Sequence, residues 1–171
     1  MLIEHHSIDH FLEGLEDIFP FQYPSILEVA HKHGFMESLA PQLKRVYRDS
    51  LAIRDKPLIE SLLTVALYHC SSAYCYILHS TTLLNTGFSL KEVKNLTDLL
   101  ELPEAVANRP KWNNILKMTF FSFRDDYITV PNMIEAKRIL DRYEYEDYGH
   151  ILTLAHTLKH IIYFYGNELA F

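Results

Sequence analysis

Residues 59–92 read IESLLTVALYHCSSAYCYILHSTTLLNTGFSLKE, and this stretch decides the predicted fold. Its first part is apolar on a wide face, which is typical of a buried helix. Ser71 and Ser72 then interrupt the pattern, because adjacent serine hydroxyls compete for backbone hydrogen bonds and favour helix caps. The stretch therefore predicts a helix that begins near Pro57, a break at the serines, and a second helix over 73–85.

The rest of the chain carries the same helical signals and no convincing strand. Further helices are predicted over 24–33, 36–51, 89–100, 112–123, 131–143 and 147–167. Ser89 and Glu92 form an S-x-x-E capping box, and the β-like run at 127–130 is too short to build a sheet. The sequence predicts an all-α bundle of seven or eight helices, with an N-terminal arm over 1–23 and a single domain over 24–171.

Composition excludes several classes of protein. The chain has 171 residues, of which 49% are apolar, and a formal net charge of −6. Its basic residues are scattered, so no patch suits nucleic acid or an anionic membrane. No apolar run reaches the ~18–20 residues of a membrane span. Because residues 1–6 lack the basic and apolar regions of a signal peptide, a cytoplasmic location is expected.

A functional motif crosses the predicted break. Glu60 stands fifteen positions before Cys75, which is followed by His79 at i+4. Tyr74, Gly87 and the S-x-x-E box complete the pattern. It resembles the signature of the alkylhydroperoxidase D-like / carboxymuconolactone decarboxylase superfamily: a Glu, C-x-Y-C-x-x-x-H, a helix that ends in Gly, and a capped helix. The resemblance is clear over 57–98 and looser to about 165. One position departs, since Ser72 replaces the first Cys of the CxxC.

The resemblance implies a thiol-dependent peroxidase on a bundle of the alkylhydroperoxidase D-like type. Cys75 would be the nucleophile, His79 the proton shuttle and Glu60 the general base or orienting group. Ser72 would hydrogen-bond the thiolate or sulfenate in place of a resolving thiol. The implied partners are a peroxide, an external thiol and further copies of the chain in a dimer, trimer or hexamer. No cofactor and no metal are implied.

The residues themselves support the same site. If Ser72 caps the second helix, Cys75 is its third residue, where the positive end of the helix dipole stabilises a thiolate and lowers the thiol pKa. His79 lies one turn on, on the same face. Glu60 would be ~22 Å away along a straight helix, so it joins only if the chain folds back. A Cys70–Cys75 disulfide also needs a local break, because the ~8–9 Å helical separation exceeds the ~7 Å limit.

Two other functions remain open. The first is a non-catalytic, oligomeric interaction protein on the same fold. The second is an acid–base enzyme of the carboxymuconolactone decarboxylase type, in which His79 and Glu60 work without a thiol.

Other polar groups favour structural roles. The H-C-x4-C-x3-H spacing around Cys75 matches no standard zinc site. The pairs Glu28/His31 and Asp147/His150 resemble di-iron motifs, but no matching glutamates accompany them. They are predicted to be solvated or capping residues. The acidic, aromatic run 143–148 is predicted to be a surface turn.

Overall fold

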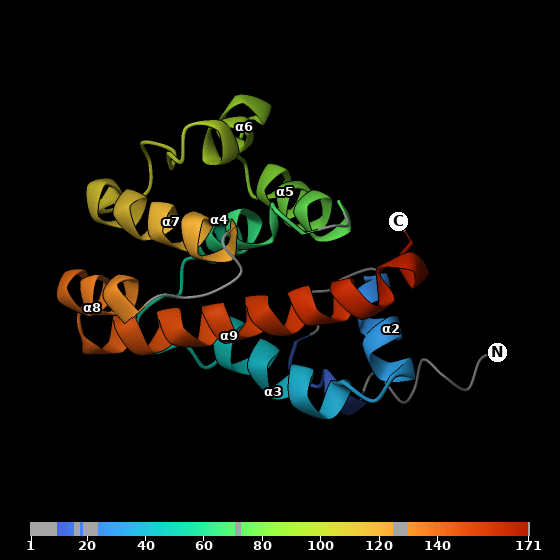
Figure 1. Ribbon diagram of the computed structural model, residues 1–171. Helices are drawn as coiled ribbons and strands as arrows, with labels where there is room; N and C mark the ends of the chain where they lie inside the picture. The colour runs from blue at the N-terminus through green and yellow to red at the C-terminus, as the bar shows by residue number, and fades with distance from the viewer. Residues whose placement is uncertain (1–9, 16–17, 19–23, 71–72, 125–129, 171) are drawn as a thin grey trace.

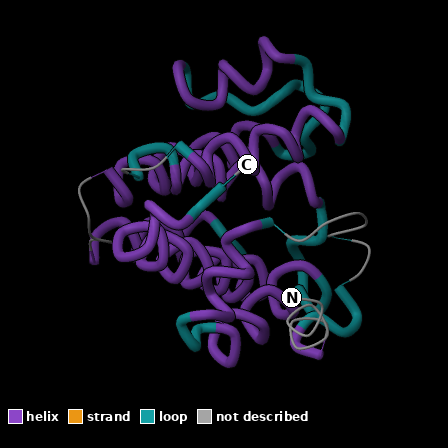
Figure 2. The backbone as a smooth tube through the Cα atoms, turned by 90° about the vertical axis from the view of Figure 1, so that its right-hand side faces the viewer, coloured by secondary structure: helices purple, strands orange, loops and turns teal. Residues whose placement is uncertain are grey.

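The computed structural model describes residues 10–15, 18, 24–70, 73–124 and 130–170, and these form eight α-helices and no strand (Figure 2). The helices are α2 (Ser25–Lys32), α3 (Met36–Tyr47), α4 (Lys56–Leu67), α5 (Tyr74–Asn85), α6 (Leu90–Asp98), α7 (Arg109–Arg124), α8 (Val130–Ile139) and α9 (Arg142–Tyr165), followed by a short 3-10 turn at Gly166–Glu168. The predicted all-α fold is confirmed. Residues 127–129 of the β-like run lie outside the described residues.

The long helix α9 organises the bundle. It runs across the molecule with α2 and α3 on one side and α4 and α7 on the other (Figure 1), and it contacts all of α2, α3, α4 and α8. Its buried face is a regular stripe that includes Ile151, Leu154, Leu158 and Ile162. Residues at this spacing lie on adjoining turns of one face, so α9 is buried along most of its length.

Helix α4 is the central helix of the group formed by α4, α5 and α7. Every residue from Leu58 to Leu67 is buried, and the helix packs against α5, α7 and α9. A helix that is apolar on all sides is stable only when it is covered on all sides. Glu60 is carried into the interior by this helix and is 2% exposed. Two residues of the predicted N-terminal arm, Leu12 and Leu15, are also buried in the core.

The two ends of the predicted break are confirmed. Helix α4 ends at Leu67 and α5 begins at Tyr74, so the chain does not form one rod between Pro57 and Gly87. Ser71 and Ser72, the predicted cause of the break, lie outside the described residues. The capping box of α6 is also as predicted: the Ser89 hydroxyl accepts from the Glu92 N–H, and the Glu92 carboxylate accepts from the Ser89 N–H.

The start of α9 corrects a prediction. The run 143–148 is not a surface turn but lies within this helix, which begins at Arg142. Asp141 and Glu144 form a second capping box that sets the start. The sequence signal was present as D-x-x-E, and it outweighs the polar composition of the run.

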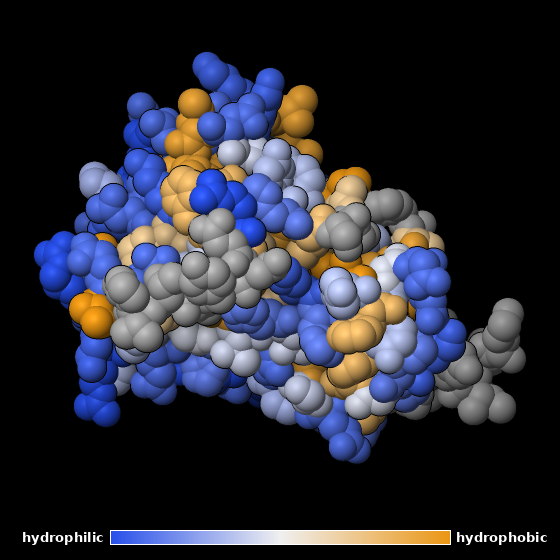
Figure 3. Space-filling view, viewed as in Figure 1, coloured by the Kyte–Doolittle hydropathy of each residue, from blue (hydrophilic) through white to orange (hydrophobic). Residues whose placement is uncertain are grey.

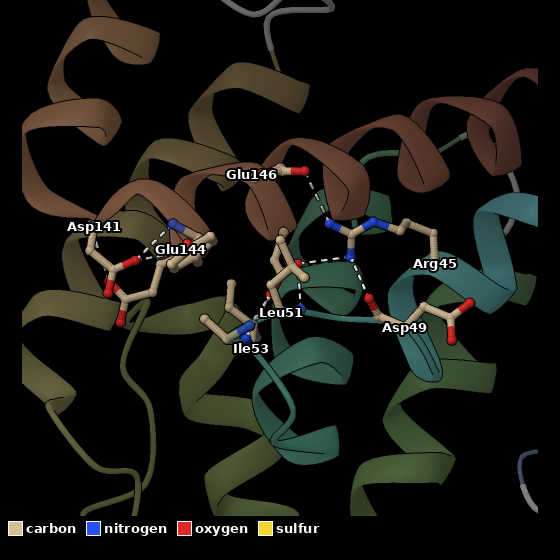
Figure 4. Close-up of polar contacts among 10 residues, drawn as sticks. Arg45, Asp49, Leu51, Ile53, Asp141, Glu144 and Glu146 are labelled. Atoms are coloured by element: carbon tan, nitrogen blue, oxygen red, sulfur yellow. Dashed lines mark hydrogen bonds and ion pairs between the residues drawn. The ribbon is translucent and has the colours of Figure 1, made fainter.

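A buried carboxylate ties the end of α3 to α9. Asp147 is 2% exposed and accepts hydrogen bonds from the backbone N–H groups of Leu51, Ala52 and Ile53 and from the Arg45 guanidinium. Figure 4 shows Arg45, Leu51 and Ile53 converging on this point. The prediction of a solvated or capping residue is wrong here, because the carboxylate lies inside the fold and crosslinks it.

On the face seen in Figure 3, hydrophilic residues predominate and hydrophobic ones are interspersed. Within the described ranges, no helix combines the length and the apolarity that crossing a bilayer demands.

Candidate functional site

The fold-back between α4 and α5 joins Glu60 to His79. His79 Nδ1 is hydrogen-bonded to Glu60 Oε2 although the two residues are nineteen positions apart. Tyr47, the last residue of α3, donates its hydroxyl to Glu60 Oε1 at 2.5 Å. The predicted meeting of the carboxylate and the imidazole is therefore confirmed. Sequence reasoning missed Tyr47, although it lies one turn after buried Leu43 on the same face of α3 and so points inward.

These contacts orient the ring of His79. Where Oε2 of Glu60 acts as the acceptor, Nδ1 carries the hydrogen of the bond that joins them. Nε2 then has a free lone pair and can act as a base. This nitrogen is buried, and it has no hydrogen-bond partner among the described residues. Since buried polar atoms are nearly always paired, this nitrogen is open to a proton donor that enters the site, such as water or a substrate.

A small cavity lies beside His79. Its volume is about 40 Å³, and both His79 and Cys75 line it. The remaining wall consists of Tyr47 and mostly aliphatic side chains from α2, α3, α5 and α9: Pro24, Ile26, Leu27, Leu43, Leu78, Leu154 and Leu158. The predicted pairing of thiol and imidazole in one pocket is therefore present. Glu60 contacts the Nδ1 side of the His79 ring and does not line the cavity.

The electrostatics of Cys75 differ from the prediction. The side chain is completely buried, and Sγ has no hydrogen bond to any described residue. Burial, aided by the nearby Cys70, raises the thiol pKa well above its usual range. Ala73 and not Ser72 is the N-cap of α5, which makes Cys75 the second helical residue. A helix terminus contributes about 0.3–1 kcal/mol, whereas full burial can shift a pKa by about 3–5 units. Desolvation therefore outweighs the dipole.

The remaining predicted site residues can be placed only in part. Ser72 lies outside the described residues, so its role stays a prediction. Cys70 is partly exposed, and it forms no disulfide with Cys75. No group of three His, Cys, Asp or Glu side chains in the described part of the chain is arranged to hold a metal ion.

Burial also acts on the phenol of Tyr47. Burial and the charge of Glu60 raise the Tyr47 pKa well above its usual value, so the hydroxyl stays protonated and keeps donating to the carboxylate. Glu60 is thus held by one permanent donor and one titratable donor. This arrangement leaves His79 as the group that can move a proton.

Comparison with protein-family models, with curated proteins and with solved structures gave no match. The functional interpretation therefore depends on the motif and on the geometry of the cavity.

Proposed function

We propose that this protein is a thiol-dependent peroxidase of the alkylhydroperoxidase D-like type, with Cys75 as the nucleophile. One observation carries the proposal: His79, whose Nδ1 is bonded to Glu60 and whose buried Nε2 has no partner among the described residues, lines the same cavity as Cys75. A base, a support for its positive charge and a sulfur nucleophile are the groups that nucleophilic catalysis requires.

In the proposed reaction His79 first accepts a proton and then returns it. His79 Nε2 takes the proton of the Cys75 thiol, and Sγ attacks the terminal oxygen of a hydroperoxide. The S–O bond forms as the O–O bond breaks, and the alcoholate that leaves takes the proton back from His79. Sulfur is oxidised to sulfenic acid, and the peroxide is reduced to an alcohol or to water. Glu60 stabilises the imidazolium that exists between the two transfers.

The raised pKa of Cys75 fits a mechanism in which the thiolate forms only beside its base. A buried thiol that stays protonated is a poor nucleophile at neutral pH. Proton transfer to His79 generates the thiolate within the cavity, where Glu60 offsets the new positive charge. Catalysis is therefore expected to depend on His79 and Glu60 as strongly as on the sulfur.

The catalytic cycle needs an external reductant. A small thiol would attack the sulfenic acid to give a mixed disulfide and water, and a second thiol would release Cys75. Such thiols are abundant in the cytoplasm, which we propose as the location. We also propose that the protein acts as a homo-oligomer, as a dimer, trimer or hexamer.

Peroxide consumption in the presence of dithiothreitol tests the proposal. Cys75→Ser is expected to reduce the rate to that of the buffer, whereas the matched control Cys70→Ser keeps the wild-type rate. Equal consumption by the wild type and Cys75→Ser would end the proposal.

One observation favours a second candidate, the acid–base enzyme of the decarboxylase type. The Cys75 thiol is buried, has a raised pKa and makes no hydrogen bond to a described residue, so His79 and Glu60 form a complete base without it. Turnover of an organic acid that survives Cys75→Ala would indicate this function.

A further inference from the structure

We propose that three leucines, Leu43, Leu154 and Leu158, limit the substrate to the smallest hydroperoxides, such as hydrogen peroxide and methyl hydroperoxide. This inference rests on the proposed peroxidase function. It goes beyond that function because it assigns the size limit to named side chains that the sequence motif does not contain.

The first argument is the volume of the cavity. A water molecule needs about 10–15 Å³ of such space, so a cavity of about 40 Å³ holds about three atoms of that size. Methyl hydroperoxide, with one carbon and two oxygens, fills it. Cumene hydroperoxide carries a phenyl ring and a branched carbon, and it does not fit unless the wall moves.

The second argument is that the wall opposite the motif is firmly packed. Leu154 is fully buried, and Leu43 and Leu158 are each 5% exposed. Leu154 and Leu158 lie one turn apart on α9, the helix that contacts α2, α3 and α4. Close-packed interiors do not yield by a phenyl ring's volume without breaking many contacts. The less buried residues of the lining are Pro24, Tyr47 and Leu78.

The third argument is the distribution of polar groups. His79 Nε2 is the unpaired nitrogen at the cavity, and the three leucines offer no hydrogen bond to a second polar group. A hydroperoxide can accept a hydrogen bond from His79 Nε2 once that nitrogen has taken the thiol proton, and it can leave a small apolar end against the leucines. A substrate with another polar group would lose its hydration there without compensation.

The test compares the rates for two peroxides in each variant. Because the fraction of folded protein affects both rates equally, it cancels from their ratio. Wild-type protein is expected to consume methyl hydroperoxide at least about 10- to 200-fold faster, in kcat/KM, than cumene hydroperoxide, the discrimination that a single misfitting group produces in an apolar pocket. Leu158→Ala and, independently, Leu43→Ala are expected to bring the two rates closer by about 10-fold or more.

Leu152→Ala is the matched control. Leu152 lies on the same helix as Leu158 and is equally buried at 4%, but it does not line the cavity. Its ratio is expected to equal that of the wild type.

The outcomes separate the two proposals. Wild-type consumption of cumene hydroperoxide as fast as methyl hydroperoxide overturns the size limit and leaves the peroxidase intact. A ratio that stays unchanged in both Leu158→Ala and Leu43→Ala overturns the assignment to these leucines. Consumption of neither peroxide by the wild type overturns the peroxidase and the size limit together.

Discussion

Two carboxylates are buried in the described part of the chain, and they are held in opposite ways. Asp147 faces a cation and three backbone N–H groups, so both of its oxygens are fully used in crosslinking α9 to the segment after α3. Glu60 faces the Tyr47 hydroxyl and the His79 ring, whose Nε2 has no partner among the described residues.

The comparison distinguishes a structural carboxylate from a catalytic one. A buried charge whose donors are all fixed can only stabilise the fold, since no proton has anywhere to go. A buried charge that supports a titratable ring can drive proton transfer at the far side of that ring. Substitutions at Asp147 should therefore affect stability, and substitutions at Glu60 should affect rate.

The largest effect is expected for Asp147→Ala. The substitution removes the shared acceptor of three backbone N–H groups and one of the acceptors of the Arg45 guanidinium, and the loss of one partner of a buried pair costs about 3–5 kcal/mol. Urea denaturation measures this loss of unfolding free energy. Glu146→Ala is the control, because Glu146 contacts the same guanidinium from an exposed position and should cost at most about 1 kcal/mol. Similar losses in both variants would contradict the account.

Glu60→Gln should lower the catalytic rate strongly and the stability only slightly. The kcat/KM for peroxide is expected to fall by about 100- to 10,000-fold, as when acid–base catalysis is lost. The unfolding free energy should fall by only about 0.5–1.5 kcal/mol, since an amide still pairs with Tyr47. Steady-state kinetics and denaturation on the same sample test both values. A variant with wild-type kcat/KM would show that the carboxylate has no catalytic role.

Acid should weaken the stabilisation that Asp147 gives to the fold. Burial opposes the ionisation of Asp147, but the three N–H groups and Arg45 hold its pKa below the usual range. Its folded pKa is thus lower than its unfolded value, about 3.9. The stability from this group is fully present above that value and is lost as the pH falls through the folded pKa. Denaturation midpoints should therefore fall in acid more steeply for the wild type than for Asp147→Asn, and parallel curves would refute this.

The smallest effect is expected for Tyr47→Phe. The substitution removes one hydrogen bond to Glu60, which contributes about 0.5–1.5 kcal/mol to stability. His79 keeps its own bond to the carboxylate, so kcat/KM should fall by less than for Glu60→Gln. The same two assays decide the order. A larger rate loss in Tyr47→Phe than in Glu60→Gln would mean that the phenol, and not the carboxylate, orients the ring.

Local signals predicted the framework of this comparison. The S-x-x-E box fixed the start of α6, and the spacing of Glu60, Cys75 and His79 around a predicted break predicted that the carboxylate would reach the imidazole. Each of these depends on residues that are close in sequence or on a single fold-back. The similar D-x-x-E signal at Asp141 was readable but was overlooked.

The rest depends on packing between distant segments. The cavity wall comes from α2, α3, α5 and α9, and no sequence interval relates Leu43 to Leu158. The burial that raises the Cys75 pKa depends on that same wall, so the helix terminus alone gave the wrong direction. Asp147 was misjudged for the same reason: its partners lie about a hundred residues earlier in the chain.

Mass spectrometry of protein that is treated with methyl hydroperoxide and then unfolded in denaturant containing dimedone, a reagent that traps sulfenic acid, tests the central claim most directly. The account predicts a dimedone adduct on Cys75, none on Cys70, and strong loss of the Cys75 adduct in Glu60→Gln. An unmodified Cys75 in wild-type protein whose peroxide has been consumed would contradict it.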